Sequence, residues 1–219
     1  MDRKKDIIKI INIIAGKYSA YAVFPDWIRW CSLSISNSCQ WFHDQIWKDR
    51  EQLYLDTIKR YTPEEGKKFL EMFNLLIETL EEPTDVLGQI YMESGMGSKA
   101  AGQFFTPYHL SLACAKVAVQ GVEPDKDGLY RINEPSCGGG GMIIAAAMAL
   151  REQGIDYQRK MRVIAQDLGW KGVYMCYLQL SLLGINAVCV QGNTLSEPYA
   201  QGYPPERVLH TPARRGLLI

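Results

Sequence analysis

The sequence predicts an α/β fold with a parallel sheet, preceded by a region built of helices. Up to about residue 92, apolar residues recur at three- and four-residue spacings, which is typical of amphipathic helices. Beyond about residue 128, strand and helix patterns alternate instead. The composition, 47% hydrophobic and 22% charged over 219 residues, is that of a globular chain. We place the junction in the Gly- and Ser-rich segment 93–99, with a helical N-terminal domain over residues 1–98 and an α/β core over residues 99–219.

The helical region carries two clear helix signals. An amphipathic stretch follows the first charged residues and ends near Gly16. A later helix starts at Thr62, a good N-cap, followed by Pro63 at the first helical position and by Glu65, which completes a capping box. Its apolar pattern continues to about Glu82, before a proline. We expect one broad face of this helix to be buried.

The bulk features indicate a cytoplasmic protein without a membrane segment or a metal site. Lys9 and Asn12 interrupt the apolar run near the N-terminus, which is too short to span a bilayer and lacks a signal-peptide cleavage site. Basic and acidic residues number 24 each, so the chain has no general basic excess for DNA binding. The 6 cysteines form no C-x-x-C pair and the 3 histidines lie far apart, which favours reduced thiols.

Residues 27–61 are rich in aromatic side chains. These are Trp27, Trp30, Trp41, Phe42, Trp47, Tyr54 and Tyr61. Such a density can form a base-stacking surface, but single-strand binders usually combine their aromatics with a basic groove, which is not obvious in this segment. Aromatic side chains at helical spacing bury large areas. We therefore predict that these side chains pack in the core.

The second part of the chain alternates strands with helices. The strand candidates are residues 129–133, 161–166 and 187–191, and the helix candidates are residues 142–153 and 170–183. This order predicts a parallel sheet wound in the Rossmann manner. Ligands bind such sheets at the carboxyl ends of the strands, so the residues after each strand form the candidate site.

Three loops follow these strands. The first contains glycines at positions 138–141, which let a ligand approach the main chain at a helix N-terminus with free amides. Tight packing of strand against helix is the alternative reason for such a turn, and a dinucleotide fingerprint fits less well because Ile143 stands where it needs a small residue. The second loop begins with Asp167, which can accept hydrogen bonds from ribose hydroxyls or cap the next helix. The third is the turn 192–195.

Four short segments occur in a fixed order along the chain. They read Gly102-Gln103-Phe104-Phe105-Thr106-Pro107, Glu134-Pro135-Ser136-Cys137-Gly138-Gly139-Gly140-Gly141, Gln166-Asp167 and Gly192-Asn193-Thr194-Leu195. In this order they resemble the motifs of the N-6 adenine DNA methylases, most closely the modification subunits of type I restriction systems. The resemblance covers about residues 85–195 and implies a Rossmann-like methyltransferase fold with S-adenosylmethionine as cofactor.

The resemblance also implies a set of cofactor-binding residues. They are Phe104, Phe105, Thr106, Glu134, Pro135, Cys137, Gly138, Gly140, Asp167 and Asn193. The two phenylalanines and the threonine would flank the adenosine and hold the methionine end, although core packing is an equal alternative for either ring. Glu134 and the glycine turn would contact the methionine moiety, and Asp167 would contact the ribose. Asn193 would bind the cofactor adenine; many relatives have Asp there, but the amide can still pair with an adenine edge.

Cys137 invites comparison with the covalent nucleophile of cytosine-C5 methylation. No Pro-Cys dipeptide and no activating base lie near it in the sequence. The family pattern carries Cys at this position as part of the glycine turn. We therefore interpret Cys137 as a small residue of that turn.

Adenine methylation also needs a site for the target amine. In the family, an [Asn/Asp]-Pro-Pro-[Tyr/Phe] motif after a fourth strand accepts the amine hydrogens and stacks on the flipped base. No intact copy occurs in this sequence. Thr211 and Pro212 occupy its first two places after a short strand-like segment, whereas Ala213 and Arg214 replace the second proline and the aromatic residue. We expect a degenerate catalytic motif in a core that is truncated at its C-terminus.

Two functions remain open. The first is an S-adenosylmethionine-dependent adenine-N6 DNA methyltransferase of a restriction-modification system, or a fragment of one. Its DNA contact would come through a partner subunit or a missing domain, and a specificity subunit or further copies of the chain would be its partners. The alternative is a catalytically degenerate cofactor-binding protein that acts as an interaction or regulatory subunit. The glycine spacing disfavours a nicotinamide-dependent reductase.

Overall fold

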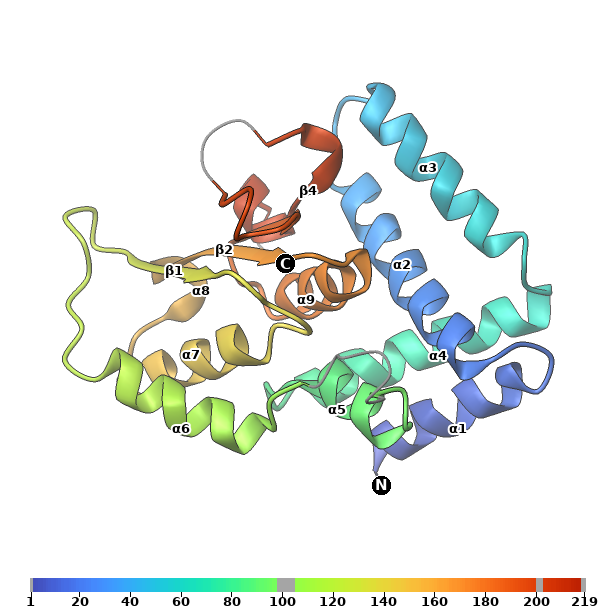
Figure 1. Ribbon diagram of the computed structural model, residues 1–219, viewed down its shortest axis with the longest axis horizontal. Helices are drawn as coiled ribbons and strands as arrows, with labels where there is room; N and C mark the ends of the chain where they lie inside the picture. Colours follow the sequence, from blue (N-terminus) through green and yellow to red (C-terminus); the bar gives the residue numbers. More distant parts are fainter. Residues whose placement is uncertain (1, 98–104, 200–202, 218–219) are drawn as a thin grey trace.

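A helical region and a mixed α/β region make up the structure, a computed structural model that describes residues 2–97, 105–199 and 203–217 (Figure 1). The helical region contains α1 (Arg3–Ala15), α2 (Ala20–Ser38), α3 (Gln45–Ile58), α4 (Pro63–Leu80) and α5 (Val86–Glu93). The α/β region contains α6 (Tyr108–Val119), β1 (Tyr130–Glu134), α7 (Gly141–Glu152), α8 (Tyr157–Lys160), β2 (Met161–Asp167), α9 (Trp170–Leu182), β3 (Ala187–Gln191), η1 (Pro205–Arg207), β4 (Val208–His210) and η2 (Pro212–Arg215). The expected order of helices, then alternating strands and helices, is confirmed.

The four-stranded sheet has the order β1-β2-β3-β4. β1 pairs with β2 and β2 pairs with β3 in parallel, as the sequence predicts, with Glu134 opposite Ala165 and Asp167 opposite Gln191. β4 pairs antiparallel with β3, with Val190 opposite Val208. Helices α7 and α9 pack against this sheet (Figure 1). The carboxyl ends of the three parallel strands therefore lie at one edge.

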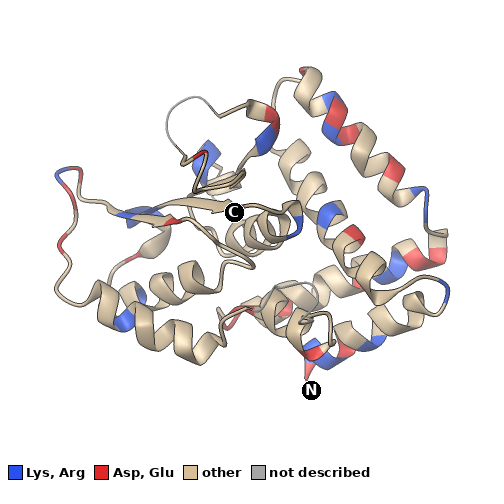
Figure 2. Cartoon of the chain, in the orientation of Figure 1, with Lys and Arg blue, Asp and Glu red and all other residues tan. Residues whose placement is uncertain are grey.

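Charge is spread unevenly over the helices. Figure 2 shows basic and acidic residues interspersed along α1, α3 and α4, whereas α7 and α9 are almost free of charge. The outer helices thus present polar faces to solvent, and the helices on the sheet are buried.

The capping box predicted for α4 is present: the Thr62 backbone N–H donates to Glu65 Oε2 at 2.7 Å, and the Glu65 N–H donates to Thr62 Oγ1 at 3.3 Å.

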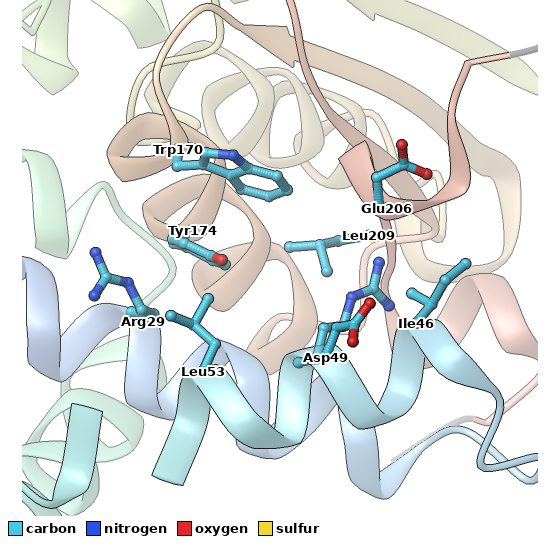
Figure 3. Close-up of a pocket in the computed structure, with 9 residues that line it drawn as sticks. Arg29, Ile46, Asp49, Leu53, Trp170, Tyr174, Glu206 and Leu209 are labelled. Carbon is cyan, nitrogen blue, oxygen red and sulfur yellow. The ribbon is translucent and has the colours of Figure 1, made fainter. Parts of the chain in front are cut away.

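The helical region packs directly on the α/β region. Helices α2 and α5 contact α9, and one cluster of buried side chains includes Trp27 from α2 and Tyr177 from α9, both fully buried. A cavity of about 310 Å³ remains where α3 faces α9, with Trp170 and Tyr174 on one side and Leu53 on the other (Figure 3). The division into domains at residue 98 stays a prediction.

The aromatic residues of segment 27–61 divide into two groups. Trp27 is fully buried, as predicted. Trp30 also packs against the core, and its ring stacks on that of Tyr54 with the ring centroids 6.2 Å apart. The prediction is wrong for Trp41 and Phe42, which are 85% and 82% exposed. Both lie in the connection between α2 and α3 rather than on a helix face, so helical spacing does not apply to them.

No single helix of the described residues is long and apolar enough to cross a membrane. The pair α1 and α2 passes the same test of length and composition only when taken together, and it is bent by 115°.

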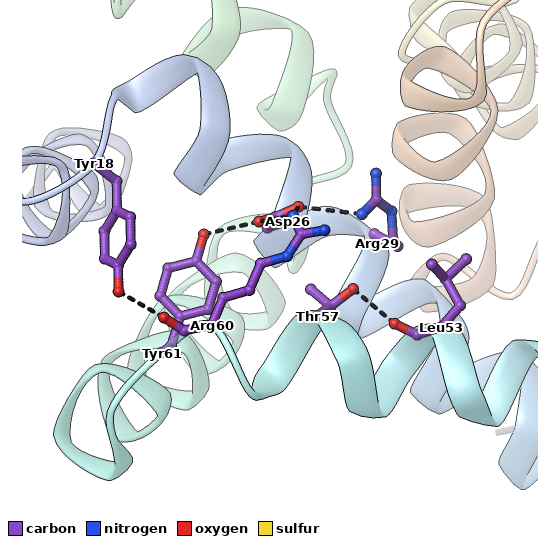
Figure 4. A network of polar contacts seen from close by, with 7 residues as sticks. All are labelled: Tyr18, Asp26, Arg29, Leu53, Thr57, Arg60 and Tyr61. Atoms are coloured by element: carbon purple, nitrogen blue, oxygen red, sulfur yellow. Dashed lines mark hydrogen bonds and ion pairs between the residues drawn. The ribbon is translucent and has the colours of Figure 1, made fainter.

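A buried carboxylate fixes the junction of α2 with the segment between α3 and α4 (Figure 4). Asp26 is 5% exposed and accepts bonds from Arg60 Nη1 at 3.1 Å, Arg29 Nη1 at 3.2 Å and the Tyr61 hydroxyl at 3.0 Å. Burial, followed by the Asp26 carboxylate, raises the pKa of Tyr61, so this phenol is a hydrogen-bond donor at neutral pH.

Replacing Asp26 by alanine should lower the free energy of unfolding by about 2–4 kcal/mol, because it removes three polar partners at a buried site. Urea denaturation measures this change. Asp56→Ala is the matched control, since Asp56 forms only exposed contacts, an ion pair with Lys59 and a hydrogen bond from Gln52 Nε2, and we expect almost no change there. Equal midpoints for the two variants would contradict the structural role of Asp26.

Candidate functional site

The loops that follow β1, β2 and β3 contact one another at the carboxyl edge of the sheet. The Cys137 N–H donates to the Gln166 carbonyl and the Gly192 N–H to the Asp167 carbonyl, both at 2.9 Å. The Thr194 hydroxyl donates to the Pro135 carbonyl at 2.6 Å. The structure therefore brings together the three loops that the sequence places after the strands.

The glycine turn adopts a backbone that requires glycine. Gly138 and Gly140 have φ values of +49° and +89°, in the left-handed region. A Cβ atom at Gly138 would lie 2.7 Å from Cε1 of Phe105, and one at Gly140 would lie 3.2 Å from Sγ of Cys176. The turn leads directly into α7, whose first amides are free to face an anion or a dipole.

Asp167 connects the end of β2 to the glycine turn. Its Oδ2 accepts the Gly138 N–H and its Oδ1 accepts the Gly169 N–H, each at 2.9 Å. The residue is 8% exposed. Because a carboxylate offers about four acceptor positions, each oxygen keeps capacity for a further donor such as a ribose hydroxyl. Asp167 therefore supports the turn and faces the edge at which a ligand would bind.

The other predicted residues of this edge are more open. Glu134 is half-buried and its Oε1 accepts the Ser136 N–H at 3.2 Å. Asn193 is exposed, and its Oδ1 accepts the Leu195 N–H at 3.0 Å. Pro135 is also exposed, and its carbonyl accepts the hydroxyl of Thr194, the residue after Asn193. Acceptors from all three strands thus surround the same edge.

Phe105 and Thr106 approach the glycine turn from the segment just before α6. The Phe105 ring packs over Gly138 and meets Tyr91 edge-on, with ring centroids 5.1 Å apart. Phe105 and the exposed Thr106 line a cavity of about 400 Å³ together with Asp85. Phe104, which the resemblance also assigns to the site, lies outside the described residues.

Asp85 and Gln179 join the helical region to the glycine turn, and sequence reasoning missed both. Asp85 caps α5 by accepting the Gly88 N–H at 2.9 Å, and its Oδ1 also accepts Gln179 Nε2 at 2.9 Å. The same Nε2 donates to the Gly139 carbonyl at 2.7 Å. Asp85 could be found from the sequence only as an N-cap, because its contact with the turn depends on the packing of α5 against α9.

Asp85 gives the fold a pH dependence. Burial raises its pKa above the ordinary value of 3.8, while the bonds from Gln179 and Gly88 lower it in part. The folded protein therefore holds this proton more tightly than the unfolded chain. The stability that the protonated group contributes is complete below pH 3.8 and is lost as the pH rises through the higher folded pKa.

Asp85→Asn tests this dependence, because asparagine keeps an acceptor oxygen and cannot ionise. Relative to the wild type, the unfolding free energy of the variant should increase as the pH rises from about 4 to about 7. Chemical denaturation at each pH measures the difference. A difference that stays constant over this range would contradict burial of an ionisable carboxylate at position 85.

Cys137 lies in a cluster of three buried thiols, with Cys176 and Cys189. The hydrogen bond with Cys176 lowers the pKa of Cys137, but burial and the thiol of Cys189 raise it by more, so its pKa lies above the ordinary value. The hydrogen bonds of Cys176 to both neighbours, together with its burial, raise its pKa as well. Thiols in this state are poor nucleophiles, which supports a packing role for Cys137 in the turn. Among the described residues, no group of three or more His, Cys, Asp or Glu side chains is arranged to hold a metal ion.

Thr211 and Pro212 do not join this edge. Because β4 runs antiparallel to β3, its end lies beside the start of β3. The fully buried Thr211 hydroxyl donates to the Ile185 carbonyl at 2.8 Å and accepts the Ala187 N–H at 3.0 Å, and Pro212 is buried beside it. The two residues fasten β4 to β3, and the structure does not bring them to Glu134, Asp167 or Asn193.

Two exposed leucines at the edge were also missed by sequence reasoning. Leu168 directly follows Asp167 and is 68% exposed, and Leu195 in the turn after β3 is 96% exposed. Apolar side chains beside hydrogen-bond acceptors suit the flat, partly apolar faces of a nucleobase. The only sequence signal was their position immediately after polar residues of the loops.

Comparison with known proteins agrees with this arrangement. The family model described as N-6 DNA Methylase matches residues 83–211. No curated protein matches the sequence significantly. The matched segment is more than half of the chain and contains Asp85, Phe105, the glycine turn, Asp167 and Asn193. This protein therefore belongs to the N-6 DNA methylase family.

Proposed function

We propose that the chain binds S-adenosylmethionine at the carboxyl edge of β1, β2 and β3 and serves as an adenine-N6 DNA methyltransferase of a restriction-modification system. One observation carries the proposal: the Asp167 carboxylate, at the end of β2, bonds to Gly138 of the turn after β1. An acid for the ribose and a glycine turn for the methionine end thereby form one unit. We also propose a cytoplasmic location, where DNA and the cofactor are both present.

The residues at this edge fit the proposed cofactor, which when bound supplies a methyl group on a sulfonium sulfur. Glu134 offers an acceptor for the amino group, and the free amides at the start of α7 suit the carboxylate. Asp167 has acceptor capacity for the ribose hydroxyls. Leu168 and Asn193 would hold the adenine by an apolar face contact and an amide bond. These assignments are the functional roles we propose for the edge.

The target adenine needs groups beyond this edge. The amine lone pair is delocalised into the ring, so acceptors for its hydrogens and a stacking residue must hold the flipped base. The sequence has no intact [Asn/Asp]-Pro-Pro-[Tyr/Phe] motif that would provide them. We therefore propose that a partner, such as a specificity subunit, a further copy of the chain or another domain, completes the site for DNA.

A second candidate function is supported by the position of Thr211. Its buried hydroxyl bonds to the backbone at the start of β3, so it is not free to bind a target amine. A protein that binds the cofactor and regulates a methylase complex without transferring methyl groups is consistent with this position.

A methyl-transfer assay separates these functions. The purified chain is incubated with labelled S-adenosylmethionine and unmethylated DNA, and N6-methyladenine is measured by mass spectrometry. Transfer that is lost in Asp167→Ala supports the enzyme. Cofactor binding without transfer, even when the partner that completes the DNA site is added, supports the regulatory protein. Absence of both would reject the proposed function.

A further inference from the structure

The connection between α2 and α3 presents two aromatic rings to solvent. Trp41 and Phe42 are 85% and 82% exposed. The connection itself is fixed: Gln40 Nε2 donates to the Phe42 carbonyl at 3.1 Å and to Asp44 Oδ1 at 3.0 Å. Large exposed aromatic side chains on an ordered segment are typical of binding surfaces. The rings are therefore held ready for a partner.

Arginines from distant parts of the sequence lie beside these rings. Arg215 Nη1 donates to the Cys39 carbonyl at 3.5 Å, and Arg50 Nη2 donates to the Val208 carbonyl at 2.7 Å. A hollow of about 350 Å³ is lined by Gln40, Trp41, Phe42, Asp44, Ile46, Arg50, Pro205, Val208, His210 and Arg215. We call this hollow the aromatic-arginine surface.

The aromatic-arginine surface carries uncompensated positive charge. Arg50 and Arg215, which line it, form no ion pair with any carboxylate of the part of the chain that the structure describes, and neither does Arg214, the residue before Arg215. Arg215 Nε is buried without a hydrogen-bond partner there. Burial lowers the pKa of His210, and the positive charges of Arg215, Arg214 and Arg50 lower it further. All three guanidinium groups therefore act on the imidazole of His210.

Asp44 is the one carboxylate among the residues that line the hollow, and it is already engaged. Its Oδ1 accepts the Trp47 N–H at 2.8 Å, as the N-cap of α3, in addition to the bond from Gln40. The net charge of the surface therefore favours an anionic partner. The sequence could not predict this, because Arg215, which completes the surface, lies about 170 residues after the aromatic pair.

We infer that the aromatic-arginine surface binds single-stranded nucleic acid, with unpaired bases stacked on Trp41 and Phe42 and phosphates facing the arginines. Adjacent exposed rings next to a basic hollow match the two requirements of single-strand binding, a stacking platform and cations for the backbone. A purely apolar protein partner would leave the arginines without counter-charges. The inference rests on the proposed function for the choice of DNA, and it gives the substrate strand a place outside the cofactor edge.

Fluorescence anisotropy with a labelled single-stranded DNA oligonucleotide tests the inference on the full chain. The double variant Trp41→Ala/Phe42→Ala should bind the strand about tenfold or more weakly, because two stacking contacts are lost. Arg215→Ala should weaken binding and reduce the slope of log affinity against log salt by about 0.7, as expected for one phosphate contact on a single strand. Leu70→Ala and Arg159→Ala, at exposed positions elsewhere, are the matched controls and should bind like the wild type.

Three outcomes would overturn the inference. They are a wild type that binds no strand at low salt, variants that bind as tightly as the wild type, and a concentration-dependent dimer that only the double variant loses. Circular dichroism and thermal midpoints equal to those of the wild type show that each variant is folded. Calorimetry of the same samples with S-adenosylmethionine separates the two proposals: cofactor binding without strand binding rejects only this surface.

Discussion

Alanine in place of Gly138 should abolish cofactor binding and destabilise the fold. The residue has φ +49°, and a Cβ atom would lie 2.7 Å from the Phe105 ring, so the variant must strain the backbone and displace the ring together. We expect a loss of about 2–4 kcal/mol in unfolding free energy, from the left-handed backbone and overpacking combined. Denaturation and calorimetry with S-adenosylmethionine measure the two effects.

Gly66→Ala is the control for Gly138→Ala. Gly66 lies in α4, and no atom lies within 4 Å of the place that a Cβ atom would take there, so alanine should raise stability by about 0.5–1 kcal/mol through its better helix propensity. If Gly138→Ala were as stable as the wild type and bound the cofactor normally, the close packing of Phe105 on the turn would not be needed for the site.

The second large effect is expected at Asp167. Asp167→Ala removes the acceptor for the Gly138 and Gly169 amides and the proposed acceptor for the ribose. Bonds to a charged group contribute about 1.5–3 kcal/mol each, so the dissociation constant for S-adenosylmethionine should rise about 100-fold or more. Asp167→Asn keeps one acceptor oxygen, so its dissociation constant should lie between those of the wild type and Asp167→Ala.

Asp127→Ala provides the matched comparison for Asp167, because its carboxylate forms only an exposed pair with Arg131. Calorimetric titration of the four proteins ranks them directly. An Asp167→Ala variant with the affinity of the wild type would remove Asp167 from the site, whatever the activity of the protein.

The sequence predicted the elements that carry strong local signals. The predicted strand 187–191 coincides with β3, the other two parallel strands differ by about one residue, and the Thr62 capping box marks the start of α4 correctly. Short apolar runs in β2 and β3, and glycines and a capping box at the ends of the helices, define these elements without help from the rest of the chain. β4 has only three residues, which is too short for periodicity to reveal a direction. Its antiparallel pairing, and with it the burial of Thr211, therefore depended on tertiary packing.

The candidate site was predictable as a set of loops but not as a network. Strand order placed Asp167 and the glycine turn at one edge, and the structure confirms that they meet. The bridge from Asp85 through Gln179 to Gly139 spans 94 residues between its first two members, and it exists because α5 packs on α9. The core packing that the sequence predicts for Trp41 and Phe42 is wrong, because both rings lie in a loop, where helix periodicity does not determine exposure.

Calorimetric titration of the intact chain with S-adenosylmethionine tests the central claim most directly. We predict saturable binding of one cofactor per chain with a dissociation constant of about 1 μM, and stabilisation of the fold by about 2.7 kcal/mol at a hundredfold excess over that constant. Absence of saturable heat at about millimolar cofactor, together with an unchanged thermal midpoint, would contradict a cofactor site at the carboxyl edge of β1, β2 and β3.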